Sequence, residues 1–196
     1  MKICAFLAPL CLVASAAGLG AAFSSQDDAE MQAKWQAFMT PGPEHKVLDA
    51  RLGKWTGKVK MWMTPGMEAM ESTCTTEYTW ALGKRYLINE THGSAMGMEF
   101  EGRGMTAYDN LKKKYVGTWV DTMGTGIMVS EGTYEAGAKT FSYMGEGPDV
   151  MAGKYTPVKT IERDVDANSW VMEMHCTDPQ SGKLFKTMEI TYSRAK

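Results

Sequence analysis

The chain has 196 residues, with 21 Lys or Arg against 23 Asp or Glu and a formal net charge of −2. This near-neutral balance argues against a nucleic acid as partner, because nucleic-acid-binding domains carry an excess of clustered basic residues. The length suffices for one domain with a sizeable core, even after the loss of a short leader.

The first 24 residues have the pattern of an export signal. Lys2 is the only charged residue, Ile3 to Val13 are mostly apolar, and small residues predominate from Ala14 to Ala22. The apolar stretch is shorter than the roughly 20 residues that a membrane-spanning helix needs. We therefore expect a signal peptide over residues 1–24, a secreted or periplasmic protein, and no membrane association once the signal is removed. A retained N-terminal anchor is the alternative, and nothing indicates an oligomeric state.

Residues 25–42 are predicted to form a helix and a linker. Apolar residues between Ala29 and Met39 fall on one helical stripe, namely Met31, Trp35, Phe38 and Met39. Pro41 and Pro43 then interrupt it. A second short helix is expected from Pro43 to Leu52, where it can cap the mouth of a barrel, with Gly53 ending it.

From Trp55 to Tyr192 apolar and polar residues alternate in about ten segments separated by turn residues. The first places Trp55, Gly57 and Val59 on one face and lysines on the other. The segments are 55–63, 71–82, 85–92, 99–108, 114–122, 127–134, 140–145, 155–165, 169–177 and 184–192. Short connections force antiparallel pairing, and closure removes exposed edges. We therefore expect an all-β, up-and-down antiparallel barrel over residues 43–196.

Two blocks of residues resemble a known family. The segment from Leu52 to Gly57 reads Leu-Gly-Lys-Trp-Thr-Gly, and the run from Phe100 to Gly104 reads Phe-Glu-Gly-Arg-Gly. Tyr108-Asp109 and then Tyr-Val-Gly-Thr-Trp-Val-Asp, residues 115–121, complete the pattern. From about Glu44 to the C-terminus the chain resembles the DUF1579 family of uncharacterised proteins. The resemblance implies a calycin-like barrel, similar in shape to lipocalins, fatty-acid-binding proteins and nitrobindins, and no established activity.

Several residues of these blocks have structural explanations. Gly53 can end the second helix, and Trp55 can plug the barrel beneath it. Gly102 and Gly104 relieve crowding or permit a bend. Asp109 suits a turn, as do the lysines 112–114 that follow it, and Gly57 belongs to the same structural set.

No catalytic motif is present, and no metal ligand or cofactor is assigned. Our candidate lumen residues are those that alternation and chemistry favour: Tyr86, Glu90, His92, Tyr108, Trp119, Asp121, Met172 and Met174. Within this set, Glu90 and His92 are an acid–base pair if they face inward, and a solvated strand end otherwise. His45 can cap its helix or donate to a carbonyl at a strand end. Since His175 alternates with Met174 and Cys176, it faces solvent if these two face the lumen.

Sulfur-containing residues leave two questions open. The chain has 17 methionines, including the pairs Met61/Met63, Met96/Met98 and Met172/Met174, each on one face of a strand. Thioethers suit Cu(I), whereas the simpler explanation is a flexible apolar lining. Cys74 and Cys176 are expected on non-adjacent strands and hence as free, buried thiols rather than a disulfide.

We expect an exported barrel that binds a small hydrophobic or amphipathic molecule. One alternative is a redox protein or enzyme that holds haem or copper in the lumen. Nitrobindins bind haem through a C-terminal histidine, but no motif around His175 matches theirs. The other alternative is a structural barrel whose core is filled by its own side chains.

Overall fold

The computed structural model describes residues 25–195. The predicted signal peptide, residues 1–24, lies outside the described residues, so export stays a prediction. The chain divides into two compact units, residues 1–36 and 37–196, which are described separately. Among residues 25–195, no helix has both the length and the apolar character needed to cross a membrane.

Helix α1 (Ser25–Met39) confirms the predicted N-terminal helix and starts earlier than its apolar stripe. The extra turn contains Asp27 and Asp28, and negative charges stabilise a helix N-terminus. The helix ends just before Thr40, which precedes Pro41, because a residue before proline disfavours the helical conformation.

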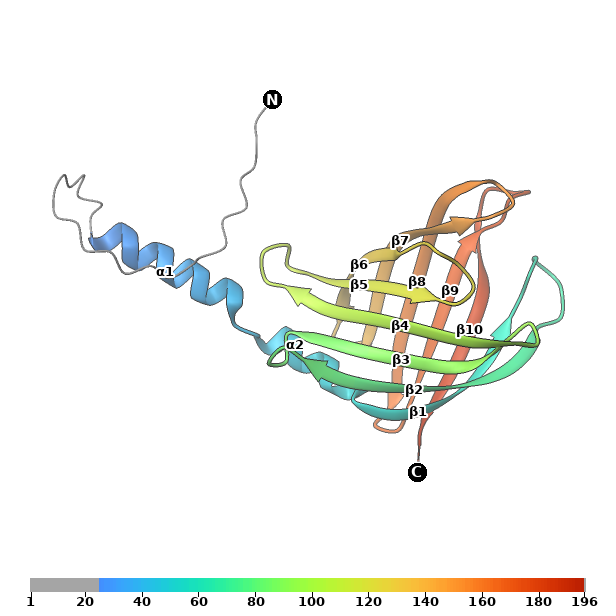
Figure 1. The fold of residues 1–196 in the computed structure, drawn as a ribbon, viewed down its shortest axis with the longest axis horizontal. Coiled ribbons are helices and arrows are strands. Elements are labelled where there is room, and N and C mark those ends of the chain that lie inside the picture. The colour runs from blue at the N-terminus through green and yellow to red at the C-terminus, as the bar shows by residue number, and fades with distance from the viewer. Residues whose placement is uncertain (1–24, 196) are drawn as a thin grey trace. The chain divides into compact units, whose positions relative to one another are not determined.

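Ten strands form one closed sheet. They are β1 (Gly53–Met61), β2 (Met70–Ala81), β3 (Tyr86–Ala95), β4 (Met98–Asp109), β5 (Lys114–Asp121), β6 (Met128–Glu135), β7 (Thr140–Asp149), β8 (Lys154–Asp166), β9 (Ser169–Thr177) and β10 (Leu184–Arg194). Each strand pairs antiparallel with the next, and β1 pairs with β10 to close the barrel (Figure 1). The predicted ten-stranded up-and-down fold is confirmed. The largest boundary differences are at the ends of β3 and β7, which run on to Ala95 and Asp149.

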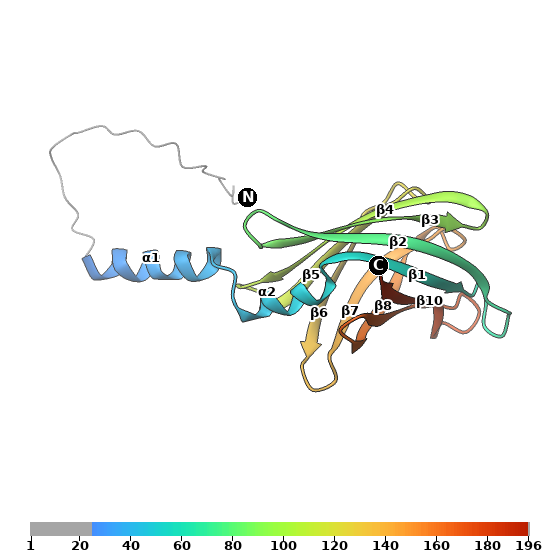
Figure 2. The same ribbon diagram turned by 90° about the horizontal axis from the view of Figure 1, so that it is seen from below.

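One end of the barrel carries a short helical cap, α2 (Pro43–Val47) and the 3-10 helix η1 (Leu48–Arg51) (Figure 2). Gly53, where β1 begins, has a φ of +91°, a conformation that is strained for residues with a side chain. This confirms its predicted role at the end of the helical segment. The backbone N–H of Gly42 donates to Nδ1 of His45 over 3.0 Å and so caps α2.

Two hydrogen bonds fasten this cap to the strands. The indole Nε1 of Trp80 donates to Oδ1 of Asp49 over 2.7 Å. The hydroxyl of Tyr115 donates to the backbone carbonyl of Glu44 over 2.9 Å. The cap is therefore held from β2 and from β5, two strands that are well separated around the barrel.

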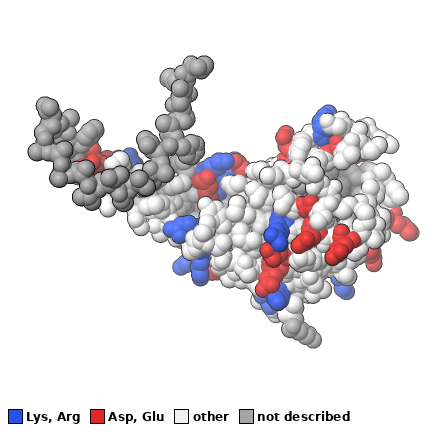
Figure 3. Space-filling model, in the orientation of Figure 1, with Lys and Arg blue, Asp and Glu red and all other residues white. Residues whose placement is uncertain are grey.

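Strand register shows which side chains face inward. In β1, Trp55, Gly57 and Val59 are buried and alternate with exposed lysines. Gly57 lies opposite Cys74 on β2 and Tyr192 on β10, so these residues share the inner face. The same alternation and pairing extend around all ten strands. On the outside, acidic and basic side chains lie interspersed over the face that Figure 3 shows.

The inner face has two parts that differ in burial. The closed half comprises the inner-face residues under the cap, which are at most 5% exposed: Trp55, Leu87, Tyr115, Phe141, Tyr143, Trp170 and Tyr192. The open half comprises the inner-face residues at the other end, which are only half-buried: Phe100, Trp119, Asp121, Met128, Ser130, Met172, Met174, Cys176 and Met188. The barrel is thus packed at one end and accessible at the other.

Candidate functional site

The closed half is a core of interlocking rings. Trp55 and Trp170 contact edge to face with centroids 6.1 Å apart, and Trp170 stacks on Tyr192 at 4.0 Å. The indole Nε1 of Trp55 also donates to the backbone carbonyl of Arg51 over 2.7 Å. Buried rings in such arrangements stabilise through both area and orientation. The predicted role of Trp55 as a plug is confirmed.

Arg51 joins the cap to the barrel wall. Its side chain is 3% exposed and its guanidinium lies 4.2 Å from the centroid of the Trp170 ring. It pairs with Asp164 and also with Glu162, whose Oε2 is 3.5 Å from Nε. Burial raises the pKa of the Glu162 carboxyl, and the charge of Arg51 opposes this shift. These opposite charges stabilise one another inside the barrel and hold the cap in place.

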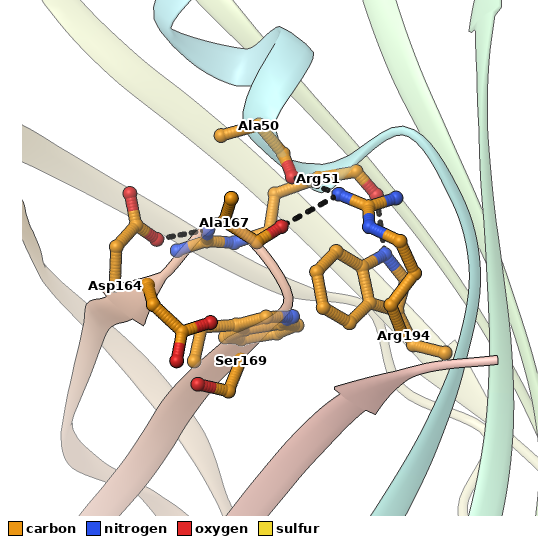
Figure 4. A pocket seen from close by; sticks show the side chains of 9 residues that line it. Ala50, Arg51, Asp164, Ala167, Ser169 and Arg194 are labelled. Atoms are coloured by element: carbon orange, nitrogen blue, oxygen red, sulfur yellow. Dashed lines mark hydrogen bonds and ion pairs between the residues drawn. The ribbon is translucent and has the colours of Figure 1, made fainter.

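A pocket of about 240 Å³ lies at the seam between η1 and the strands (Figure 4). Arg51, Arg194, Asp164 and Asp166 line it, so charges of both signs meet there. Arg194 is engaged with the cap, since its Nη1 donates to the backbone carbonyl of Leu52 over 2.8 Å. The volume lies below the roughly 300 Å³ at which small-molecule sites usually begin. We interpret the pocket as part of the cap's attachment.

An aromatic wall lies in the open half. The ring of Trp119 on β5 is nearly parallel to that of Phe100 on β4, with centroids 6.4 Å apart and 18° between planes. A Cβ added at Gly102 or Gly104 would come within 2.3 or 3.1 Å of the indole, so these glycines make room for it. The indole Nε1 donates to Oδ2 of Asp121 over 2.6 Å. The glycines therefore relieve crowding as predicted, and Asp121 orients the ring.

A methionine wall lies half-way around the barrel from the aromatic wall. Met172 and Met174 on β9 and Met188 on β10 are on the inner face, and Met174 is the cross-strand partner of Met188. Met61 on β1 is in turn the partner of Met188, and Met70 on β2 is the partner of Met61. Thioether side chains are flexible and polarisable, so this wall can adapt to different shapes.

Polar groups lie at the level where the two halves meet. Glu162 is the cross-strand partner of Met172, and its side chain is 23% exposed. Burial raises the pKa of both Tyr78 and Tyr143, and the nearby charge of Glu162 adds to each shift. These tyrosines therefore keep their protons at neutral pH. Glu162, whose carboxylate pairs with Arg51 of the cap, thus lies at the floor between the two halves.

Three predicted lumen residues lie on the outer face, so their assignment to the lumen is wrong. Tyr86, Glu90 and His92 alternate with the inner-face residues of β3. The Nε of Arg103 lies 3.6 Å from Oε1 of Glu90, and Nδ1 of His92 lies 3.9 Å from Oε1 of Glu101. These are surface pairs with side chains about half exposed or more, and such pairs contribute little to stability.

The physical reason is that β3 keeps its ionisable side chains, Glu90 and His92, on the face in contact with water. Leu87, Asn89 and Thr91 face inward. The hydroxyl of Thr91 forms a hydrogen bond with that of Thr76 over 2.9 Å, which satisfies both in the interior. The inner face of β3 thus carries no ionisable side chain, and an acid–base pair of Glu90 and His92 in the lumen is excluded.

Tyr108 is half-buried on the inner face and lies at the capped end, next to the closed half. Its ring contacts those of Tyr115 at 5.0 Å and His45 at 5.9 Å. Burial lowers the pKa of His45, and a hydrogen bond to the backbone of Tyr108 opposes this. His45 thus fills both predicted roles, at the cap and at a strand end. Of the predicted lumen residues, the structure brings Trp119, Asp121, Met172 and Met174 to the open half.

All three histidines lie among the described residues, and none of them is in the open half: His45 is buried in the cap and His92 is on the outer face. His175 is on the outer face, where its Nε2 is 3.2 Å from Oε2 of Glu173, as expected if Met174 faces inward. A haem held by a histidine inside the barrel therefore does not fit this arrangement. Within residues 25–195, no three His, Cys, Asp or Glu side chains cluster in a way that could hold a metal ion.

The two cysteines among residues 25–195 fall in different surroundings. Cys74 on β2 is buried in the core around Trp55, while Cys176 on β9 is half-buried in the open half. Burial raises the pKa of both thiols. Strands β1 and β10 separate β2 from β9, in agreement with the expected free thiols.

The model of the family described as "Protein of unknown function (DUF1579)" matches residues 40–194. The chain belongs to this family. A search of curated proteins found no match. Among solved structures, the fold resembles Rv2717c from M. tuberculosis, with a TM-score of 0.61, 14% identity, and coverage of 80% of this chain and 100% of that one. It also resembles the S-type phycobiliprotein lyase CPES from Guillardia theta, with a TM-score of 0.58, 11% identity, and coverage of 83% and 97%.

At these identities the structural matches show a shared barrel fold and nothing about a shared ligand. Trp119, Asp121, Gly102 and Gly104 all lie within the matched range and belong to the sequence blocks that resemble this family. Sequence reasoning missed Arg51, Glu162 and Asp164. The only indication of these ion pairs in the sequence was that Glu162 and Asp164 lie on the same face of β8 as Val158, which is buried.

Proposed function

We propose that the barrel binds a small apolar or amphipathic molecule through its open half. One observation carries the proposal: the aromatic and methionine side chains there face inward yet are only half-buried. Apolar groups in an accessible interior release water when an apolar ligand covers them, which favours binding. The closed half offers no such surface, since its rings are already in contact with one another.

The polar floor supports an amphipathic ligand. Glu162 lies between the capped core and Met172, and its side chain is 23% exposed. A ligand with an apolar body and a hydrogen-bond donor at one end matches this order of groups. Small-molecule sites generally combine apolar walls with a few such polar groups.

A purely structural barrel would be packed from end to end. The fully buried rings under the cap agree with that alternative, but the half-buried Phe100 and Trp119 count against it at the other end. Export is a further part of the proposal, since the sequence of residues 1–24 has the pattern of a signal peptide. Fractionation of expressing cells and N-terminal sequencing of the protein would test it directly.

Ligand binding is tested by titrating the protein with the fluorescent apolar probe N-phenyl-1-naphthylamine. Met174→Trp fills the open half and should weaken probe binding by about tenfold or more, roughly the effect of losing one good apolar contact region. Met144→Trp, on the outer face and 49% exposed, is the matched control and should leave binding unchanged. Equal affinity in all three proteins, or no binding by the wild type, would refute the proposal.

Native mass spectrometry of the protein as isolated provides an independent test. A bound small molecule should be lost from Met174→Trp and retained by Met144→Trp. If a ligand co-purifies equally with both variants, it binds elsewhere and the open half is not the site.

A further inference from the structure

Four methionines form a row across four neighbouring strands. Met70, Met61, Met188 and Met174 occupy successive partner positions on β2, β1, β10 and β9. All four are on the inner face, because cross-strand partners share a face of the sheet and Met174 and Met188 face inward. Partner residues in antiparallel strands have Cα atoms about 5 Å apart, and a methionine side chain spans a similar length. Sulfur atoms from three adjacent strands can therefore converge on one point inside the barrel.

The chemistry of this row is uniform. Its donors are neutral thioethers, which are soft ligands and favour Cu(I) over Ca²⁺, Mg²⁺ or other hard ions. Two further sulfur atoms flank it on β9, those of Met172 and Cys176, two residues to either side of Met174. The Sγ of Cys176 accepts a hydrogen bond from the hydroxyl of Thr187 over 3.3 Å.

The loops at the same end offer an entry path. The exposed methionines of this rim come from four loops or adjacent strand ends, and all are more than two-fifths exposed: Met63, Met67, Met70, Met96, Met98, Met123 and Met151. Soft donors on the rim can take up a soft ion and pass it to the row inside by ligand exchange. The outward-facing Met105 and Met144 do not belong to this end.

We propose that Met61, Met188 and Met174 bind one Cu(I) ion in the open end of the barrel, in a site made of thioethers from three adjacent strands. The histidines and carboxylates of the described chain are not needed for it. The site uses the methionine wall alone, so it stands independently of the proposed apolar ligand, which also contacts the aromatic wall.

The test is an anaerobic competition between the full chain and the Cu(I) chelator bicinchoninate. The wild type should retain one Cu(I) per chain, with X-ray absorption showing sulfur as the only ligand type. Replacing all three residues, M61L/M174L/M188L, should lower the affinity by about a hundredfold or more. Leu conserves volume and apolar character, and circular dichroism confirms that the variant is folded.

The matched control is M105L/M144L, two methionines on the outer face, which should change the affinity by less than about twofold. The triple variant should still bind N-phenyl-1-naphthylamine, so loss of metal and loss of apolar binding are separable. Failure of the wild type to take copper from the chelator overturns the proposal. So does equal weakening by the control, or a result in which Cys176→Ser abolishes binding while the triple variant retains it.

Discussion

The closed and open halves of the barrel are built from the same ten strands but differ in what covers them. Under the cap, Leu48 and Arg51 enter the barrel end and the surrounding rings become almost fully buried. At the other end no helix within residues 37–195 covers Trp119 or Met174, and they stay half-buried. The difference teaches that the candidate site arises from incomplete packing rather than from a catalytic motif.

The turns at the two ends differ in the same sense. At the closed end the connections carry Lys84, Lys112 and Lys139, and Lys114 lies 3.1 Å from Glu131, as suits the solvated turn predicted there. At the open end they carry exposed methionines such as Met67 and Met151. One end is therefore suited to water and the other to apolar or soft ligands.

The largest expected effect concerns the attachment of the cap. Arg51→Met removes the cation that neutralises Glu162 and Asp164, and breaking a buried ion pair on one side typically costs about 3–5 kcal/mol. Urea denaturation should show this loss of unfolding free energy. Arg103→Met, which breaks only surface pairs, should change it by less than about 0.5 kcal/mol. If both variants lose the same small amount, the cap does not depend on Arg51.

A smaller loss of unfolding free energy is expected at the contact between Gly102 and the Trp119 ring of the aromatic wall. Gly102→Ala places a methyl group against the Trp119 ring, and overpacking of this kind costs about 1–3 kcal/mol. Tryptophan fluorescence should change as the indole moves. Gly137→Ala is the control, because nothing lies within 4 Å of a Cβ there, and it should be neutral. A neutral Gly102→Ala would contradict the described position of the indole.

The smallest effect is a pH dependence from the floor between the halves. Burial raises the pKa of Glu162, so the folded state binds this proton more tightly than the unfolded state does. Stability therefore falls as the pH rises from below the ordinary glutamate value through the raised one. Relative to Glu162→Gln, the wild type should lose unfolding free energy over that range. Denaturation curves from pH 4 to 8 measure it, and a gain instead of a loss would contradict the shift.

Much of the fold is predictable because alternation and turns are local. The β1 pattern around Trp55 and the turn at Asp109, whose Oδ1 accepts hydrogen bonds from the next residues, are read directly from sequence. The end of β7 is not, because Gly145, Gly147 and Pro148 have turn composition. Pairing with β8 keeps them in the strand, and the missing side chain of Gly147 makes room for Val158.

The site is less predictable because it depends on distant parts of the chain. Arg51 contacts Glu162 and Asp164 only because the barrel closes, so no local sequence pattern predicts these ion pairs. On β3 the candidate pair of Glu90 and His92 lies outside, and Leu87, Asn89 and Thr91 form the inner face. The methionine row requires the register of β1, β9 and β10, which pairs such as Met172/Met174 do not reveal on their own.

The two free cysteines of the barrel, Cys74 and Cys176, allow the central claim to be measured directly, since each reports on one half. A short pulse of N-ethylmaleimide on the native full chain, followed by peptide mapping, gives the labelling rates of Cys74 and Cys176 separately. An accessible open half predicts that Cys176 reacts about ten times faster or more, because Cys74 is reached only through opening of the packed core. An apolar probe should slow Cys176 and leave Cys74 unchanged. Equal rates for the two thiols would contradict the division of the barrel into a closed and an open half.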